Sequence, residues 1–150
     1  MAILIGQFNH QLDEKGRMRV PARLRDTIGS TPTLILGTTE DHLLLYSADE
    51  TVKLFDKLFS DALPGDDKSE ALRNISEYSK PLEADSQGRF LLDSELLKKA
   101  NIKKNVVTIG AYNHLEIWAE EEWLARKAKN SMSMAESFKK ASKKGATDNE

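Results

Sequence analysis

The fold depends on the stretch Asp13-Glu14-Lys15-Gly16-Arg17-Met18-Arg19-Val20-Pro21-Ala22-Arg23-Leu24-Arg25. Its first four residues are typical of a tight turn, because aspartate suits the first position and Gly16 can adopt the positive φ that such turns need. Residues 17–20 alternate charged and apolar, which predicts a strand with one solvent-facing side and one buried side. Pro21 then suits the first turn of a helix, which Gly29 ends.

The same turn is repeated 72 residues further along the chain, as Asp85-Ser86-Gln87-Gly88-Arg89. One short motif could recur by chance, but the same offset also relates residues of the following helix and strands. The matched pairs are Leu24 and Leu96, Leu34-Ile35 and Val106-Val107, His42-Leu43 and His114-Leu115, Leu45 and Ile117, and Tyr46 and Trp118. Two copies are too few for a solenoid, so we expect one domain with pseudo-two-fold symmetry.

Each copy continues into a predicted β-hairpin, and helices flank the hairpins, so we predict the α+β fold class. The predicted hairpin strands are residues 33–37 with 42–46 and residues 106–110 with 114–118. Further helices are predicted for residues 48–62, for residues 68–79, for a short segment capped by Asp93 or Ser94, and for residues 120–129. The chain then divides into a first copy with its following helix (1–62), a helical connector (63–80), a second copy with its following helix (81–129) and a flexible tail (130–150).

The helix after the first hairpin begins with Ser47-x-x-Glu50, which predicts a capping box. It places Phe55, Leu58 and Phe59 on one face. Large apolar residues with this spacing are usually part of a core, so we expect this face to be buried.

Composition limits the classes of protein that the chain can belong to. The 22 basic and 24 acidic residues give a net charge of −2, so the overall charge does not indicate a polyanionic partner. The absence of cysteine excludes disulfides and cysteine-ligated metals, and it fits a reducing compartment. No apolar run approaches the roughly 20 residues of a membrane span. We therefore expect a cytoplasmic protein without a membrane partner.

Enzyme chemistry has little support in the sequence. The chain has no cysteine nucleophile, no glycine-rich phosphate loop and no His-x-x-x-His metal pair. His10, His42 and His114 are far apart, and the last two occupy equivalent hairpin positions, so a structural role explains both. We predict that the protein is not an enzyme and has no metal site, cofactor or small-molecule substrate.

A locally basic segment is the stronger functional signal. Residues 15–25 contain five cations and no acid. Arginines bind phosphates and read guanine edges in the major groove of DNA, which a two-stranded ribbon can enter. The candidate DNA-contacting residues are Lys15, Arg17, Arg19, Arg23 and Arg25. The alternative is a solvated face on which Asp13 and Arg17 form an internal salt bridge that holds the turn.

The stretch 13–25 resembles the MraZ family of bacterial transcription regulators. The second half of the family is matched by Asp85-Ser86-Gln87-Gly88-Arg89-Phe90-Leu91-Leu92, followed by Leu115-Glu116-Ile117-Trp118 and by Trp123. Both motifs occur in order, and the resemblance covers about residues 1–128.

The resemblance implies a fold and a function. Each copy would be an AbrB-like (SpoVT–AbrB) β-hairpin unit, and the two would form a pseudo-two-fold, β-barrel-like core with flanking helices. Proteins of this family form rings of about eight or twelve subunits, closed by head-to-tail contacts. They bind double-stranded DNA at tandem repeats in the promoter of the division and cell-wall gene cluster, usually as repressors. A nucleoid-associated homo-oligomer is therefore expected.

The family motif also implies residue roles. Arg17 would be the DNA-contacting arginine, with Lys15 and Arg19 beside it, whereas Asp13 and Gly16 would stabilise the turn. Arg89 is the equivalent candidate in the second copy, with Asp85 and Gly88 as its turn residues. The charges from Asp85 to Lys99 sum to zero, and Asp93 stands where the family often has proline, so we assign the first copy to DNA and the second mainly to fold and assembly.

Two other functions remain open at the level of sequence. One is an AbrB-type antitoxin that also grips a toxin, although such proteins usually carry a single copy of the motif. The other is a ring-forming scaffold protein without a role in DNA binding, which the net charge and the Phe55/Leu58/Phe59 face would allow.

Overall fold

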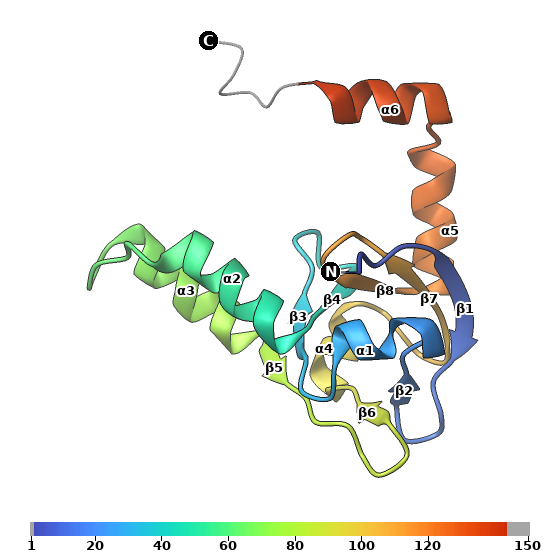
Figure 1. The fold of residues 1–150 in the computed structure, drawn as a ribbon, viewed down its shortest axis with the longest axis horizontal. Helices are drawn as coiled ribbons and strands as arrows, with labels where there is room; N and C mark the ends of the chain where they lie inside the picture. The colour runs from blue at the N-terminus through green and yellow to red at the C-terminus, as the bar shows by residue number, and fades with distance from the viewer. Residues whose placement is uncertain (1, 144–150) are drawn as a thin grey trace.

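The computed structural model describes residues 2–143 of the chain, and it confirms a mixture of strands and helices (Figure 1). The elements in chain order are β1 (Gln7–Gln11), β2 (Arg17–Arg19), the 3-10 helix η1 (Ala22–Leu24), α1 (Arg25–Ile28), β3 (Thr33–Leu36), β4 (His42–Tyr46), α2 (Ala48–Phe59), α3 (Asp67–Glu77), β5 (Ser79–Pro81), β6 (Arg89–Leu91), α4 (Ser94–Lys99), β7 (Asn105–Gly110), β8 (Leu115–Ala119), α5 (Glu120–Lys129) and α6 (Met134–Ser142).

The main sheet is antiparallel and has the strand order β1-β7-β8-β4-β3-β5. This order is symmetric about the contact between β4 and β8, which are equivalent strands of the two copies. Within that contact His42 lies opposite Trp118, so the offset of 72 residues also relates the two sides of the central strand pair. The duplication in the sequence is therefore a duplication of structure.

The strands within residues 2–143 do not close into a barrel. The strands β1 and β5 are the two open edges of the main sheet, and β2 and β6 pair only with each other, as a separate two-stranded ribbon. Each Asp-x-x-Gly turn lies between a strand of the main sheet, β1 or β5, and a strand of the ribbon, β2 or β6. The prediction of a barrel-like core is thus wrong as to closure, and the mixed α and β content is right.

The hydrophobic core lies between the main sheet, the ribbon and the short helices. Met18 and Phe90 point into it from paired positions of β2 and β6, with exposed fractions of only 1% and 2%. Leu24 from η1 and Leu96 from α4, which the repeat relates, are buried in the same cluster. The ribbon is consequently fixed to the body by one apolar face.

The opposite face of the sheet holds two stacked ring pairs. The ring of His42 stacks on Trp118 at 4.2 Å between centroids, and Tyr46 stacks on His114 at 4.6 Å. The repeat exchanges these two pairs, which supports the structural role predicted for both histidines. Trp123 of α5 adds an edge contact to Trp118 and so anchors α5 to the sheet.

The helices α2 and α3 differ from expectation, because neither contains a buried residue. They form a helical hairpin that projects away from the sheet (Figure 1), and their apolar residues stay at least partly exposed. Leu58 remains 40% exposed, and the prediction that the Phe55/Leu58/Phe59 face is plain core is therefore wrong for the single chain. Ser47 does accept the predicted cap bond from the Glu50 amide, but the Glu50 carboxylate binds Lys53.

A helix also stands in the segment expected to be a flexible tail. Ser133 and Glu136 form a capping box that begins α6, and this local signal went unrecognised in the sequence. The exposed side chains of Met134 and Phe138 give the helix an apolar face. Residues 144–150 of the predicted flexible tail lie outside the described part of the chain.

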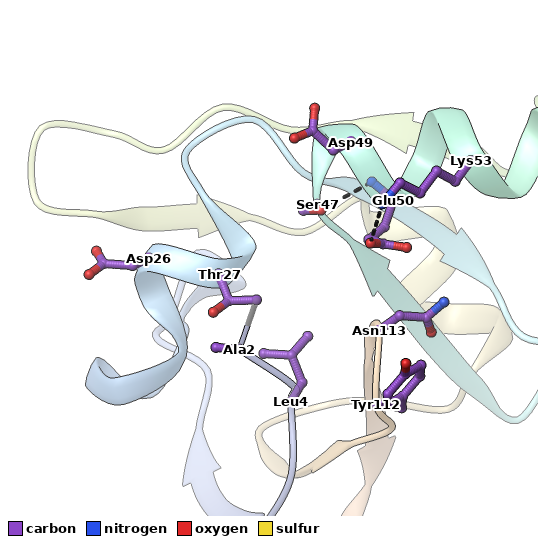
Figure 2. Close-up of a pocket in the computed structure, with 10 residues that line it drawn as sticks. All are labelled: Ala2, Leu4, Asp26, Thr27, Ser47, Asp49, Glu50, Lys53, Tyr112 and Asn113. Carbon is purple, nitrogen blue, oxygen red and sulfur yellow. Dashed lines mark hydrogen bonds and ion pairs between the residues drawn. The ribbon is translucent and has the colours of Figure 1, made fainter.

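An acidic hollow lies between the N-terminal segment, α1, the start of α2 and the β7–β8 connection (Figure 2). Its volume is about 330 Å³, and Asp26, Asp49 and Glu50 line it together with a single cation, Lys53. Because carboxylates repel phosphates, this surface does not suit a nucleic acid.

Candidate nucleic-acid interface

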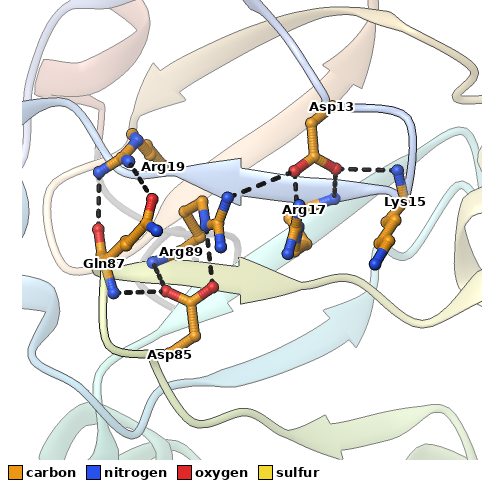
Figure 3. Close-up of polar contacts among 7 residues, drawn as sticks. All are labelled: Asp13, Lys15, Arg17, Arg19, Asp85, Gln87 and Arg89. Atoms are coloured by element: carbon orange, nitrogen blue, oxygen red, sulfur yellow. Dashed lines mark hydrogen bonds and ion pairs between the residues drawn. The ribbon is translucent and has the colours of Figure 1, made fainter.

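The β2–β6 ribbon brings the two copies of the motif side by side (Figure 3). Arg17 lies opposite Leu91, Met18 opposite Phe90, and Arg19 opposite Arg89. Met18 and Phe90 face the core, so the other four side chains share the outer face of the ribbon. The predicted alternation of charged and buried residues in this stretch is confirmed.

Asp13 organises the first turn through three hydrogen bonds. One carboxylate oxygen accepts the backbone N–H groups of Lys15 and Arg17, both at 2.9 Å, and the other accepts Arg17 Nε at 2.6 Å. Gly16 has a φ of 80°, in the left-handed region where a side chain would be strained, and its N–H donates to the Asp13 carbonyl. These are the contacts that Asp13 and Gly16, the two residues expected to stabilise the turn, make in the structure.

Asp85 repeats the arrangement in the second turn. It accepts the N–H groups of Gln87 and Arg89, both at 2.9 Å, and Arg89 Nε at 2.8 Å. Gly88 has a φ of 75°. The two turns therefore have the same hydrogen-bond pattern.

These bonds also hold the two arginine side chains in a defined orientation. Each guanidinium group uses its Nε–H on the aspartate, so its terminal Nη groups remain available for other acceptors. Arg89 lies between the two aspartates, with Nη1 at 4.0 Å from the Asp13 carboxylate (Figure 3). The side chains of Arg17 and Arg89 are 27% and 22% exposed, and both reach solvent on the outer face.

Both aspartates remain charged at neutral pH. The pKa of Asp13 is lowered, first by the hydrogen bond from the Arg17 backbone N–H, and the pKa of Asp85 is lowered in the same way by Arg89. A charged carboxylate accepts stronger hydrogen bonds than a neutral one, so the braces of both arginines persist under physiological conditions.

Arg19 is held differently, by the turn of the other copy. Its Nη1 donates to the Gln87 carbonyl at 2.6 Å, and Nη2 lies 3.5 Å from the Gln87 side-chain oxygen. The arginine is exposed, so its remaining donors face solvent. Nothing in the sequence pattern singled out Gln87, because its role depends on a strand pairing between residues 68 positions apart.

The other basic residues predicted to contact DNA do not all lie beside the ribbon arginines. Arg25 lines a groove of about 420 Å³ together with Arg17, Arg19 and Arg89, and its Nε–H donates to the Val20 carbonyl at 2.9 Å. Arg23 instead donates to the Ile5 carbonyl and lies over the Phe8 ring. The side chain of Lys15 is exposed at the tip of the first turn. The structure thus brings Arg25 to the arginine cluster and leaves Arg23 beside β1.

Strand β1 forms the other wall of this groove, and no local sequence pattern indicates this. Phe8, Asn9, His10 and Gln11 line it. His10 Nε2 lies 2.7 Å from Thr108 Oγ1, and burial lowers the pKa of His10. Only the fold reveals that β1 lies beside the basic ribbon.

Comparison with known proteins gives a consistent family assignment. Two matches to the family described as "MraZ protein, putative antitoxin-like" cover residues 3–74 and 79–144. The chain is 35% identical over 121 residues to the transcriptional regulator MraZ of Alkaliphilus metalliredigens. The aligned residues cover 81% of this chain and 84% of the relative. It is 35% identical over 132 residues to the same-named protein of Caldicellulosiruptor saccharolyticus, covering 88% and 92% of the two chains.

The chain belongs to the MraZ family. The two matched segments correspond to the two structural copies, so the resemblance and the internal repeat describe the same tandem organisation. These MraZ relatives carry the name of a regulator and not of an enzyme, which confirms the prediction that the chain is not an enzyme.

Two structural observations complete the description of this MraZ chain. Within residues 2–143, no group of three or more histidine, aspartate and glutamate side chains is arranged to hold a metal ion. No helix in the same part of the chain is long and apolar enough to cross a membrane.

Proposed function

We propose that the protein is an oligomeric, sequence-specific DNA-binding regulator of transcription, and that the β2–β6 ribbon is its reading element. The observation that carries this proposal is the outer face of the ribbon, where Arg17, Arg19 and Arg89 lie together with their guanidinium groups oriented by Asp13, Gln87 and Asp85. The naming of the MraZ relatives as transcriptional regulators supports it.

The geometry suits direct contact with bases. The major groove is about 12 Å wide and admits a two-stranded ribbon. An arginine whose Nε is already bound to the protein can offer its terminal nitrogens to O6 and N7 of guanine, and each such pair discriminates against a wrong base by about 1–3 kcal/mol. Holding the arginines in place before binding reduces the entropy lost on association. Arg17 and Arg89 are therefore proposed to read bases together, so that the second copy takes part in recognition.

The surrounding cations are proposed to bind the phosphate backbone. Lys15 extends from the tip of the first turn, and Arg25 and Arg19 lie along the groove. Contacts of this kind fix the register of a protein on the duplex without reading sequence. Arg23, which is engaged by Ile5 and Phe8, is proposed to contribute less.

Assembly is proposed to multiply the affinity of one ribbon. The α2–α3 hairpin projects from the body with half-exposed apolar residues, and such a surface suits contact with a neighbouring subunit. A head-to-tail ring of AbrB-like units would present several ribbons to successive repeats of a promoter, and linked contacts gain affinity by avidity. From the family resemblance, we propose the division and cell-wall cluster as the target, repression as the effect and the nucleoid as the location.

The proposal is tested by fluorescence anisotropy with duplex DNA from upstream of the protein's own gene and with a shuffled duplex, each at several salt concentrations. Tight binding of the first duplex that weakens steeply with salt is expected, because phosphate contacts release counterions. The Arg17→Ala variant should bind about 100-fold more weakly or worse. Lys127→Ala is the matched control, since Lys127 is exposed on α5, away from both the ribbon and the α2–α3 hairpin.

Equal and weak binding of both duplexes would contradict sequence-specific recognition, and unchanged affinity of Arg17→Ala would contradict the role of Arg17. Circular dichroism and the molar mass in solution should be the same for the wild type and both variants. A ring that fails to bind any DNA would favour the scaffold alternative.

An antitoxin function is the second candidate, because the description of the matched family includes the words "antitoxin-like". It predicts a small toxin bound in stoichiometric amount. Affinity purification of the protein from its own host would recover such a partner, whereas a regulator of the proposed kind would be recovered alone or with DNA.

A further inference from the structure

One residue on the outer face of the ribbon does not match the chemistry of its neighbours. The face carries four side chains, of which three are arginines and the fourth is Leu91. Leu91 is 60% exposed, although it lies directly opposite Arg17 and two residues from Arg89. A large apolar side chain is thus held in water beside two arginines of a cationic face.

The internal repeat shows which residue of the first copy corresponds to Leu91. The offset of 72 residues relates Arg17 to Arg89, Met18 to Phe90 and Arg19 to Leu91. Three of the four outer positions keep an arginine, and the fourth replaces it with leucine. A phosphate-binding surface would gain from a cation at this position, so general attraction to DNA does not explain the leucine.

Packing within the chain does not explain it either. Phe90 and Leu92, on either side of Leu91, are 2% and 3% exposed and face the core. They hold the backbone of β6 in place, so the Leu91 side chain is directed outwards and cannot turn into the core. A single exposed leucine is ordinary on a protein surface, but here the position is fixed and lies beside both reading arginines, Arg17 and Arg89.

We infer that Leu91 recognises the methyl group of a thymine in the major groove. The inference rests on the proposed DNA-binding function and adds a second base type to what the ribbon reads. Thymine presents a C5-methyl group at this edge, and apolar side chains are the usual partners of that methyl. Arginine, in contrast, prefers guanine at the same edge.

The spacing is suitable for neighbouring bases. Side chains directly opposite one another in an antiparallel pair have Cβ atoms about 4.5–5.5 Å apart. Base pairs are stacked about 3.4 Å apart along the duplex. With Arg17 on a guanine, Leu91 would lie over a base pair one or two steps away. The ribbon would then require a thymine close to a guanine in each repeat.

The test replaces thymine by deoxyuridine, which lacks only the methyl group. Duplexes from upstream of the gene carry the replacement at one equivalent position in every repeat, and each thymine position is examined in turn by anisotropy. At one of these positions the replacement should weaken binding of the wild type, by about fourfold for each methyl group that Leu91 contacts. This factor corresponds to the free energy of burying one methyl group. Leu91→Ala should bind the thymine and deoxyuridine duplexes equally well.

Leu124→Ala is the matched control, because Leu124 is 59% exposed on α5, away from the ribbon, and this variant should keep the thymine preference of the wild type. Equal losses for the wild type and Leu91→Ala would overturn the inference, as would a wild type that binds every deoxyuridine duplex like the natural one. Failure of the wild type to bind the natural duplex at low salt would instead overturn the proposed function, and the inference with it.

Discussion

The two Asp-x-x-Gly-Arg turns have the same internal geometry and different surroundings. In each, one aspartate accepts two backbone N–H groups at 2.9 Å and the Nε of the arginine four residues later. After the turn the copies diverge, since the first continues with Arg19 and a proline and the second with Leu91 and an aspartate. The motif determines the backbone of the turn, and the residues around it determine the chemistry of the surface.

The helices that follow the two turns show the same principle. Pro21 precedes the 3-10 helix η1 and the four-residue helix α1. Neither of these helices has a side-chain hydrogen bond that caps its N-terminus. Asp93 accepts the Leu96 N–H and begins the six-residue helix α4. Equivalent leucines of the two helices are nevertheless buried in the same core, so burial is preserved where capping and charge are not. Duplication has therefore retained the interior and left the exterior free to differentiate.

The largest predicted effect concerns the shared interior of the ribbon. Phe90→Ala should lower the free energy of unfolding by about 3–5 kcal/mol, because it leaves a cavity under β6, and Met18→Ala should cost about 2–5 kcal/mol. Both side chains are almost fully buried and lie opposite one another. Urea denaturation followed by circular dichroism measures both values. A loss below 1 kcal/mol for either variant would show that the ribbon is not held by this apolar pair.

The turn glycines should show how closely the two turns are equivalent. Gly16→Ala and Gly88→Ala should each cost about 1–2 kcal/mol, because φ is 80° and 75° and an L-residue is strained there. A Cβ at Gly16 would lie 3.4 Å from Leu97, whereas one at Gly88 would meet no atom within 4 Å, so both costs are mainly conformational. Gly65→Ala, also at positive φ but in the α2–α3 connection, is the control for strain away from the ribbon. Costs that differ by more than twofold between the two ribbon turns would contradict their equivalence.

Local chemistry made part of this molecule predictable from sequence. The turns, the hairpins and α5 were predicted because each depends on residues close together in the chain, such as Asp13 with Gly16. The constant offset also predicted the pseudo-symmetry. The strand β5 was missed because it has only three residues and includes Pro81, which is tolerated at a sheet edge.

The sequence predicts which residues belong to the candidate site, but not how they are arranged. The basic residues and the aspartates could be named from the motif, but the ribbon register that places Arg19 opposite Arg89 depends on pairing between distant segments. The brace from Gln87 and the groove wall formed by β1 follow from that register, so no local pattern predicts them. The failure of the sheet to close, and the exposure of the α2 face, likewise depend on how the elements are placed in space.

Exchanging the one unequal pair on the outer face of the ribbon, Arg19 and Leu91, should change the salt dependence of DNA binding. Leu91→Arg adds a cation, so the slope of log K against log salt should become steeper by up to about 0.9 for one added phosphate contact. Arg19→Leu should make it shallower by a similar amount and should also release Gln87. Anisotropy titrations with the upstream duplex at four salt concentrations give both slopes. If both variants had the same slope as the wild type, neither position would lie near phosphate.

The smallest predicted effect is on the pH dependence of stability, and it concerns a residue that the two copies do not share. His10 in β1 pairs with Thr108, and the repeat places the apolar Leu82 at the equivalent position. Burial lowers the pKa of His10 in the folded chain below its unfolded value of about 6.5, so the unfolded state binds more protons in the interval between the two values.

Stability from His10 is therefore fully present above pH 6.5 and is lost as the pH falls towards the folded pKa. His10→Leu, which copies the second repeat, should reduce the loss of stability between pH 7 and pH 5 without abolishing it, because burial also lowers the pKa of His114. Urea midpoints at pH 5, 6 and 7 measure this slope, and His42→Gln serves as a comparison variant at a stacked ring. A slope unchanged by His10→Leu would mean that the His10–Thr108 contact does not bury the imidazole in solution.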